Sequence, residues 1–226
     1  MYLDSTYLIF VLPAMLLAFW AQFKVNSTYE KFSKVQNHRG ITGAEVAVKI
    51  LNLHGIYNVR VEHISGKLSD HFDPRSNVIR LSDGVYSGTS VAALGVAAHE
   101  TGHAIQHAKG YMPIKLRNAI VPVASLGSNL AVPLAIFGLI FSMPVLIDAG
   151  IILFTAVVAF QFVTLPVEFN ASRRAISVLD SQGILYGDEL KGAKKVLSAA
   201  ALTYVAAAAV ALGNLLRLLA LRGRRD

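Results

Sequence analysis

A stretch near the middle of the chain, VAAHETGHAIQ, carries His99, Glu100 and His103 in the pattern His-Glu-x-x-His. On an α-helix this spacing places both imidazoles on one face, so that both can bind a single zinc ion. The glutamate between them can then take a proton from zinc-bound water, whose pKa zinc lowers to about 7. The motif therefore predicts a zinc hydrolase in which His99 and His103 are metal ligands and Glu100 is the general base.

A catalytic zinc ion needs a third protein ligand beside an open position. The extended motif with Gly and His three and six residues after the second His is absent, because Gln106 and Lys109 stand there. His107 continues the helical stripe, but it lies about 12 Å from His99 along the axis, so we expect it at the rim. We predict Glu168, in TLPVEFNASRRA, as the ligand, because a carboxylate in apolar surroundings is costly unless it is paired or bound to metal.

Two alternatives to a Glu168 ligand remain open. Glu168 can instead be an interfacial residue that pairs with Arg173 or Arg174. The stretch PVLIDAG also offers Asp148, in a setting similar to the Leu-Asp-Gly of site-2 intramembrane proteases, although Ala149 replaces the Gly. Under this second alternative, the helix that carries the histidines would itself cross the membrane.

The composition is too apolar for an ordinary soluble domain. Hydrophobic residues make up 54% of the 226 residues and charged residues 15%, and the mean hydropathy is +0.51, whereas soluble domains carry about 25% charged residues. The net charge of +7 fits the cytoplasmic loops of a membrane protein better than a nucleic-acid surface, because no aromatic residues cluster among the Lys and Arg. The absence of Cys excludes disulfides and a thiolate metal site.

Four apolar runs are each about long enough to cross a hydrocarbon core of ~30 Å. No basic residue precedes the first run, which predicts a retained membrane helix rather than a cleaved signal peptide. The predicted divisions are transmembrane helix 1 in 1–23, a cytoplasmic part with the motif helix in 24–117, a transmembrane hairpin in 118–165, a cytoplasmic helix with the third ligand in 166–195, and a C-terminal hydrophobic helix with a basic tail in 196–226.

The polar region after the first run predicts a small α+β unit. TGAE at 42–45 is a capping box, which predicts a helix from there to about His54. YNVRVEHI and SNVIRLS predict strands, and the second is either an edge strand that pairs with substrate or an ordinary sheet strand. Together with the apolar runs, these elements predict a mainly α, polytopic membrane protein, with a zincin-like α+β metalloprotease unit joined to three or four transmembrane helices.

Four segments, SDHFDPRSNVIRLS, GVAAHETGHAIQ, LPVEFNASRRA and AAALTYVAAA, together resemble the YugP-type family of membrane neutral zinc metallopeptidases, from about Ser69 to the C-terminus. The layout is more distantly similar to that of the HtpX and Ste24 membrane proteases. The resemblance implies a zinc-dependent endopeptidase with one catalytic Zn²⁺, held by His99, His103 and Glu168, and with Glu100 as the base.

Departures from these patterns concern the hydrogen bonds around the zinc ligands. Ser172 stands where the HtpX-like pattern has Asp, and Asn170 stands where the closer family often has Asp. The run DHFDP either lines the cleft or only forms a turn, and the reaction also needs a donor to its oxyanion. The candidates for substrate binding, oxyanion stabilisation or hydrogen bonding to the ligands are His71, Asp73, Arg80, His107, Ser172, Arg173, Arg174 and Tyr204.

The charge distribution orients the chain. Residues 24–117 carry twelve Lys or Arg and the loop around Asp148 carries none, so the positive-inside rule places the polar region and Glu168 in the cytoplasm. Arg217 and Arg222 break this rule if the last run crosses, so that run is either an exception or a shallow helix. We expect an integral protein of a bacterial-type plasma membrane that contacts lipid and cleaves proteins or peptides, with its active site facing the cytoplasm. The alternatives are a site-2-like protease and a non-catalytic zinc-binding scaffold.

Overall fold

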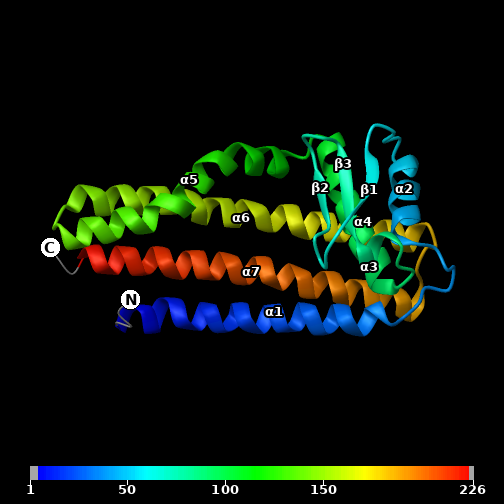
Figure 1. Ribbon diagram of the computed structural model, residues 1–226, viewed down its shortest axis with the longest axis horizontal. Coiled ribbons are helices and arrows are strands. Elements are labelled where there is room, and N and C mark those ends of the chain that lie inside the picture. The colour runs from blue at the N-terminus through cyan, green and yellow to red at the C-terminus, as the bar shows by residue number, and fades with distance from the viewer. Residues whose placement is uncertain (1–4, 224–226) are drawn as a thin grey trace. The chain divides into compact units, whose positions relative to one another are not determined.

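The computed structural model describes residues 5–223, so Arg224 and Arg225 of the predicted basic tail lie outside it. Within that range helices dominate, and the strands form one small sheet (Figure 1). The elements in chain order are a π-helical turn Tyr7–Val11, α1 Leu12–Ser33, α2 Gly43–Leu53, β1 Arg60–Ile64, β2 His71–Asp73, β3 Val78–Ser82, α3 Asp83–Tyr86, α4 Val91–Ala108, α5 Met112–Ile140, α6 Pro144–Ser181 and α7 Gly187–Gly223.

The chain forms two compact units. The first comprises Met1–Gln22, Lys115–Pro166 and Leu202–Asp226, and the second comprises Phe23–Ile114 and Val167–Ala201. Helices α1, α5, α6 and α7 each begin in one unit and end in the other. The sheet and α4 belong entirely to the second unit.

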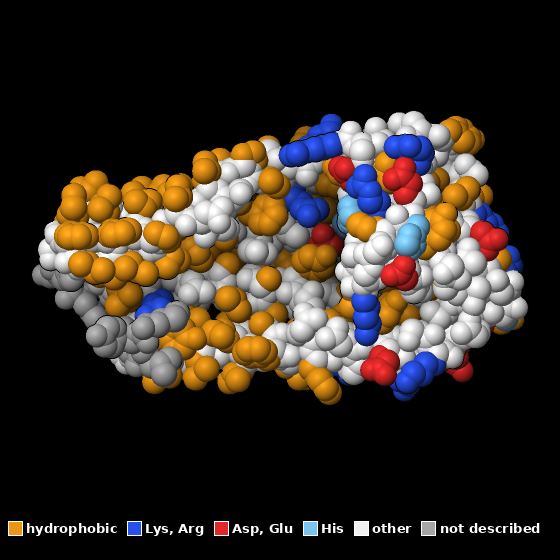
Figure 2. All heavy atoms as spheres, in the orientation of Figure 1, with side chains coloured by type: hydrophobic (Ala, Val, Ile, Leu, Met, Phe, Trp, Pro, Cys, Tyr) orange, Lys and Arg blue, Asp and Glu red, His pale blue; other side chains and the backbone are white. Residues whose placement is uncertain are grey.

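Four helices of the described chain are long and apolar enough to cross a membrane. In each, the most apolar 18-residue window is only 22–39% buried, so most of that surface has no protein partner. Figure 2 shows hydrophobic side chains covering α5 and the start of α6, where Val145 and Ile152 are both more than 70% exposed. Apolar surface of this extent suits lipid rather than water. The prediction of a mainly α, polytopic membrane protein is confirmed.

Glycines bring α5 and α6 close together in the first unit. A Cβ atom at Gly150 would lie 2.7 Å from the carbonyl oxygen of Ala131, and one at Gly138 would lie 2.7 Å from a side-chain carbon of Ile147. Small residues at such contacts are typical of membrane helix pairs, because close backbone packing replaces the hydrophobic effect that water would supply.

Helix α7 continues unbroken for 37 residues, which is enough for a full crossing. In the first unit, the Arg222 Nε donates a hydrogen bond of 2.9 Å to Asp148 Oδ1, and this ion pair joins the end of α7 to the start of α6. The Arg217 guanidinium lies 5.2 Å from the centre of the Tyr7 ring. Two of the arginines that break the charge rule therefore have partners within the helices.

The second unit contains a three-stranded sheet in the order β1-β3-β2. The central strand β3 pairs in parallel with β1 and antiparallel with β2, and four of its five residues are buried. Of the two interpretations of SNVIRLS, the edge strand is wrong and the ordinary sheet strand is right, because β1 and β2 occupy both sides of it. The turn before β3 includes Asn77 at φ +52°.

Helix α4 forms the centre of the second unit. The Ser90 side chain caps it by accepting a hydrogen bond of 3.1 Å from the Ala93 amide. The capping box of Thr42 and Glu45 likewise starts α2. Of the 18 residues of α4, 14 are buried, so the helix has almost no surface for lipid. Its apolar neighbours include Val46, Ile50, Ile79, Leu81, Leu179 and Leu197.

Candidate metal centre

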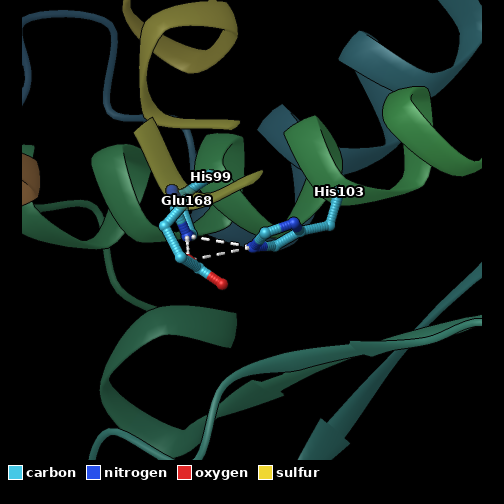
Figure 3. A group of neighbouring side chains, drawn as sticks. All are labelled: His99, His103 and Glu168. Atoms are coloured by element: carbon cyan, nitrogen blue, oxygen red, sulfur yellow. Dashed lines mark hydrogen bonds and ion pairs between the residues drawn. The ribbon is translucent and has the colours of Figure 1, made fainter. Parts of the chain in front are cut away.

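The side chains of His99 and His103 on α4 converge with that of Glu168 on α6 (Figure 3). The two Nε2 atoms are 3.2 Å apart. Glu168 Oε2 lies 3.3 Å from the Nε2 of His99 and 3.4 Å from that of His103. The Glu168 side chain is only 3% exposed and those of His99 and His103 are 12% and 11% exposed, so the cluster is largely buried.

These three atoms have the spacing that a zinc ion requires. In a tetrahedral site with bonds of ~2.0–2.1 Å, neighbouring ligand atoms are separated by about 3.3 Å. The three observed separations, 3.2, 3.3 and 3.4 Å, match one face of such a tetrahedron. Two imidazoles and one carboxylate also form a ligand set of catalytic zinc, whose fourth position stays open. The cluster therefore fits a metal ion in both geometry and chemistry.

Glu100 lies on α4 next to the first of these histidines and is 8% exposed. Among the described residues, its carboxylate makes neither a hydrogen bond nor an ion pair. Burial by itself lowers the pKa of His103, but a hydrogen bond to Glu168 and the charge of Glu100 outweigh it and raise that pKa above its usual value. Burying a carboxylate without a hydrogen-bond or ion-pair partner costs folding free energy, and such groups are typical of functional sites.

The second nitrogen of each imidazole also has a neighbour. Ser172 Oγ lies 3.1 Å from His99 Nδ1, and Gln106 Oε1 lies 3.1 Å from His103 Nδ1. Contacts of this kind orient the rings of metal-binding histidines and leave Nε2 for the ion. Gln106 was considered in the sequence only as a mismatch to the extended motif. Its position three residues after His103, on the same helix face, was the signal that could have identified it.

Three candidates from the sequence form a separate cluster on the sheet. The Arg80 Nη1 lies 3.4 Å from both His71 Nε2 and Asp73 Oδ2. Hydrogen bonds from the Ser76 side chain and the Arg75 amide lower the pKa of Asp73 to about 2. Among the described residues, none of these side chains belongs to the metal-binding group, and their contacts stabilise the turn before β3.

His107, Arg173 and Arg174 belong to the second unit, and none of them has a described contact with the three converging side chains. His107 is exposed, and its ring centre lies 5.8 Å from that of Phe72. Arg173 is exposed, and Arg174 donates to Asn170 instead of pairing with Glu168. Tyr204 lies on α7 in the first unit. The first unit also contains the ion pair between Asp148 on α6 and Arg222 on α7. The pairing of Glu168 with Arg173 or Arg174 is therefore not found.

Gly102 controls how closely α4 approaches α6. A Cβ atom at this position would lie 2.7 Å from the carbonyl oxygen of Ala171, which is closer than real Cβ contacts. Ala171 is three residues after Glu168 on the same helix, so the separation of the two backbones also sets the distance from the carboxylate to the imidazoles. The motif pattern treats this glycine as a variable position, and only the structure reveals its role.

We expect Gly102→Ala to weaken zinc binding, because the added methyl group pushes α6 and Glu168 away from α4. Overpacking a core costs about 1–3 kcal/mol of stability. If the protein relieves this strain by moving Glu168 away from the histidines, zinc affinity should fall by ~5- to 150-fold. Competition with a chelator measures the dissociation constant. The matched control is Gly95→Ala on the same helix, where the new Cβ would lie 3.5 Å from Ala193, an ordinary contact. Equal affinities for the two variants would contradict the prediction.

Comparison with known proteins agrees with this geometry. Residues 7–223 match the family described as "Putative neutral zinc metallopeptidase". The chain is also 50% identical, over 222 residues, to the "Putative membrane protease YugP" of Bacillus subtilis (strain 168), a match that covers 97% of this chain and 99% of that protein. No solved structure matches the chain. The resemblance found in the sequence motifs is therefore confirmed over nearly the whole length.

Proposed function

Because the chain belongs to this family of neutral zinc metallopeptidases, we propose that it is a membrane-anchored endopeptidase. Its substrates are membrane or membrane-proximal proteins, whose peptide bonds it hydrolyses at the cytoplasmic face. The observation that carries the proposal is the triangle of two imidazoles and a carboxylate with separations of 3.2–3.4 Å, beside a buried glutamate.

Each residue of the centre has a distinct task in this reaction. His99, His103 and Glu168 would hold the zinc ion, which would act as a Lewis acid and lower the pKa of water to about 7. Glu100 accepts a proton from the attacking water at its carboxylate and returns it to the leaving amine. The burial of these side chains limits access of bulk water, which strengthens the electrostatic interactions among them.

The orientation in the membrane follows from charge. Residues 24–117 and 166–195 lie in the cytoplasm, because the first of these segments carries twelve Lys or Arg and the α5–α6 loop carries none. The chain then crosses four times through α1, α5, α6 and α7, so that the start of α1 and the end of α7 lie outside. The ion pair between Arg222 and Asp148 supports a full crossing by α7, because it joins the end of that helix to the start of α6.

The site-2-like alternative finds less support. Its third ligand would be Asp148, whose carboxylate is 50% exposed and pairs with Arg222. Its motif helix would face lipid, whereas α4 is covered by the α2, β3, α6 and α7 side chains of the second unit. The non-catalytic scaffold rests on the departures from the family patterns at Asn170 and Ser172, and a measurement of peptide cleavage decides between it and an enzyme.

Metal removal tests the proposed activity. We expect the purified protein in detergent to cleave an unfolded substrate such as casein. Removal of the metal with 1,10-phenanthroline should lower the cleavage rate by at least ~100-fold, because the ion activates the water. Addition of stoichiometric Zn²⁺ should restore the rate. An inhibitor of serine proteases is the control and leaves the rate unchanged. Cleavage that continues at full rate in metal-free protein would show that zinc is not the catalyst.

Cysteine labelling tests the orientation. The chain contains no Cys, so single-Cys variants can be labelled without background. Tyr57 in the second unit is 79% exposed and Met143 in the α5–α6 loop is 49% exposed. We expect a membrane-impermeant maleimide to label Met143→Cys in intact cells and Tyr57→Cys only after lysis. The reverse labelling pattern would mean that the membrane topology is inverted and that the metal centre faces the outside.

A further inference from the structure

A chain of hydrogen bonds leads from the metal centre to an arginine on α6. His103 Nδ1 lies 3.1 Å from Gln106 Oε1. The Gln106 Nε2 donates to the Val167 carbonyl at 2.8 Å and to Asn170 Oδ1 at 3.0 Å. Asn170 Oδ1 also accepts a hydrogen bond of 2.7 Å from Arg174 Nε. Gln106 is 0% exposed, so its three bonds are formed inside the protein and not with solvent.

Arg174, at one end of this series of hydrogen bonds, determines which partner donates and which accepts in each of them. A guanidinium can only donate, so Asn170 must present its carbonyl oxygen to Arg174. Gln106 meets that same oxygen and must present its NH₂ group, which leaves its own carbonyl oxygen facing His103. Because a carbonyl only accepts, His103 must carry its proton on Nδ1. The other ring nitrogen, Nε2, lies 3.4 Å from Glu168 Oε2 and is the one left to bind a metal ion.

We propose that Arg174, Asn170 and Gln106 form a one-directional hydrogen-bond chain that holds His103 in the Nδ1–H tautomer, with its Nε2 lone pair presented to the metal. The three are positioning residues, because none of them touches the ion. Because Nδ1 is bonded to Gln106, Nε2 is the ring nitrogen that remains to bind the ion. The inference rests on the proposed function.

Gln106 also fixes the distance between the helices that supply the ligands. Its bond to the Val167 carbonyl reaches the residue immediately before Glu168. One side chain on α4 therefore orients a histidine of its own helix and holds the backbone of α6 next to the carboxylate. Loss of an outer partner of this kind typically reduces metal affinity by 10- to 100-fold.

Substitutions at Asn170 test the direction of the chain. Asn170→Asp keeps an acceptor for both Arg174 and Gln106, so we expect a zinc dissociation constant within about threefold of wild type. Asn170→Leu removes the acceptor, and we expect it to weaken zinc binding by about 10-fold or more. Thr101→Val is the control on α4, since the Thr101 hydroxyl is buried but bonds only to the Ala97 carbonyl of its own helix. Equal affinities for Asn170→Asp and Asn170→Leu would overturn the proposal.

A double substitution separates a chain from two independent contacts. Gln106→Leu cuts the link to His103, and we expect about a 10- to 100-fold loss of zinc affinity. Adding Asn170→Leu should then change the dissociation constant by less than about threefold, because the upstream residue acts only through Gln106. Fully additive losses would overturn the proposal, and if Gln106→Leu fails to fold, the Asn170 pair alone decides.

Zinc binding by the unsubstituted protein distinguishes this inference from the function on which it rests. If wild type binds no zinc, the metallopeptidase proposal itself fails. If wild type binds zinc and His103→Ala abolishes binding while Asn170→Leu and Gln106→Leu bind like wild type, the metal site stands and only the hydrogen-bond chain is wrong. Chelator competition measures all of these constants without any assay of cleavage.

Discussion

Replacing Glu100 by Gln is expected to reduce peptide cleavage by about 10²- to 10⁴-fold, the usual contribution of general acid–base catalysis, while zinc binding stays at the wild-type level. The amide has the shape of the carboxylate but cannot accept a proton. Because Glu100 has no hydrogen-bond or ion-pair partner among the described residues, the substitution breaks no contact that stabilises the fold. The loss should appear in kcat, measured with zinc-loaded protein in detergent.

Glu30→Gln is the matched control for this result. It makes the same change in charge at a side chain that is 65% exposed and whose one ion pair within residues 5–223 is with Lys34. We expect its rate to equal that of wild type, since exposed ion pairs contribute little. A Glu100→Gln variant that binds zinc and cleaves at full rate would exclude Glu100 as the base. A wild-type protein that binds zinc without any turnover would instead favour the scaffold.

Features encoded within one helical turn could be predicted from the sequence. The two histidines of α4 lie four residues apart, so their shared face follows from helix geometry alone. The caps of α2 and α4 likewise depend on residues within three positions of each other. Glu168 was found by a different argument, because an acidic side chain inside an apolar segment is costly without a partner. Its 3% exposure in the structure agrees with that reasoning.

Features that depend on distant partners could not be predicted. The bonds of Gln106 join residues 61 and 64 positions apart in the chain, and no local pattern indicates them. His71, Asp73 and Arg80 were plausible site residues because of their types, but pairing across β2 and β3 lets them satisfy one another. The central position of β3 in the sheet likewise depends on its pairing with both β1 and β2.

Helix α6 shows a third kind of limit. The sequence predicts the transmembrane hairpin in 118–165 and the cytoplasmic helix in 166–195 as separate elements. The second half of the hairpin and the start of the cytoplasmic segment form one helix of 38 residues, Pro144–Ser181, that passes through Pro166. A proline removes one backbone hydrogen bond, and helices of membrane proteins tolerate this where neighbouring groups compensate. The continuity matters for function, because it makes the ligand-bearing segment a direct extension of a membrane helix.

Replacing Glu168 by Ala should strongly weaken metal binding. It removes one of three converging ligand atoms and leaves only the two imidazoles of α4. Since the loss of an outer hydrogen-bond partner already costs 10- to 100-fold in affinity, we expect the loss of a ligand to exceed about 100-fold. The zinc content of the purified protein and the dissociation constant from chelator competition are the measurements. The control is Asp148→Ala, which removes the other acidic candidate and breaks only its ion pair with Arg222.

Thermal unfolding distinguishes a lost ligand from a lost fold. A metal that binds only the folded state adds about 2.7 kcal/mol at 100 times its dissociation constant, so zinc should raise the Tm of wild type and of Asp148→Ala alike. Glu168→Ala should unfold cooperatively without zinc and show no rise when zinc is added at the same concentration. If Asp148→Ala loses the zinc-dependent rise and Glu168→Ala keeps it, Asp148 is the third ligand, and the proposed orientation of the metal centre toward the cytoplasm fails with it.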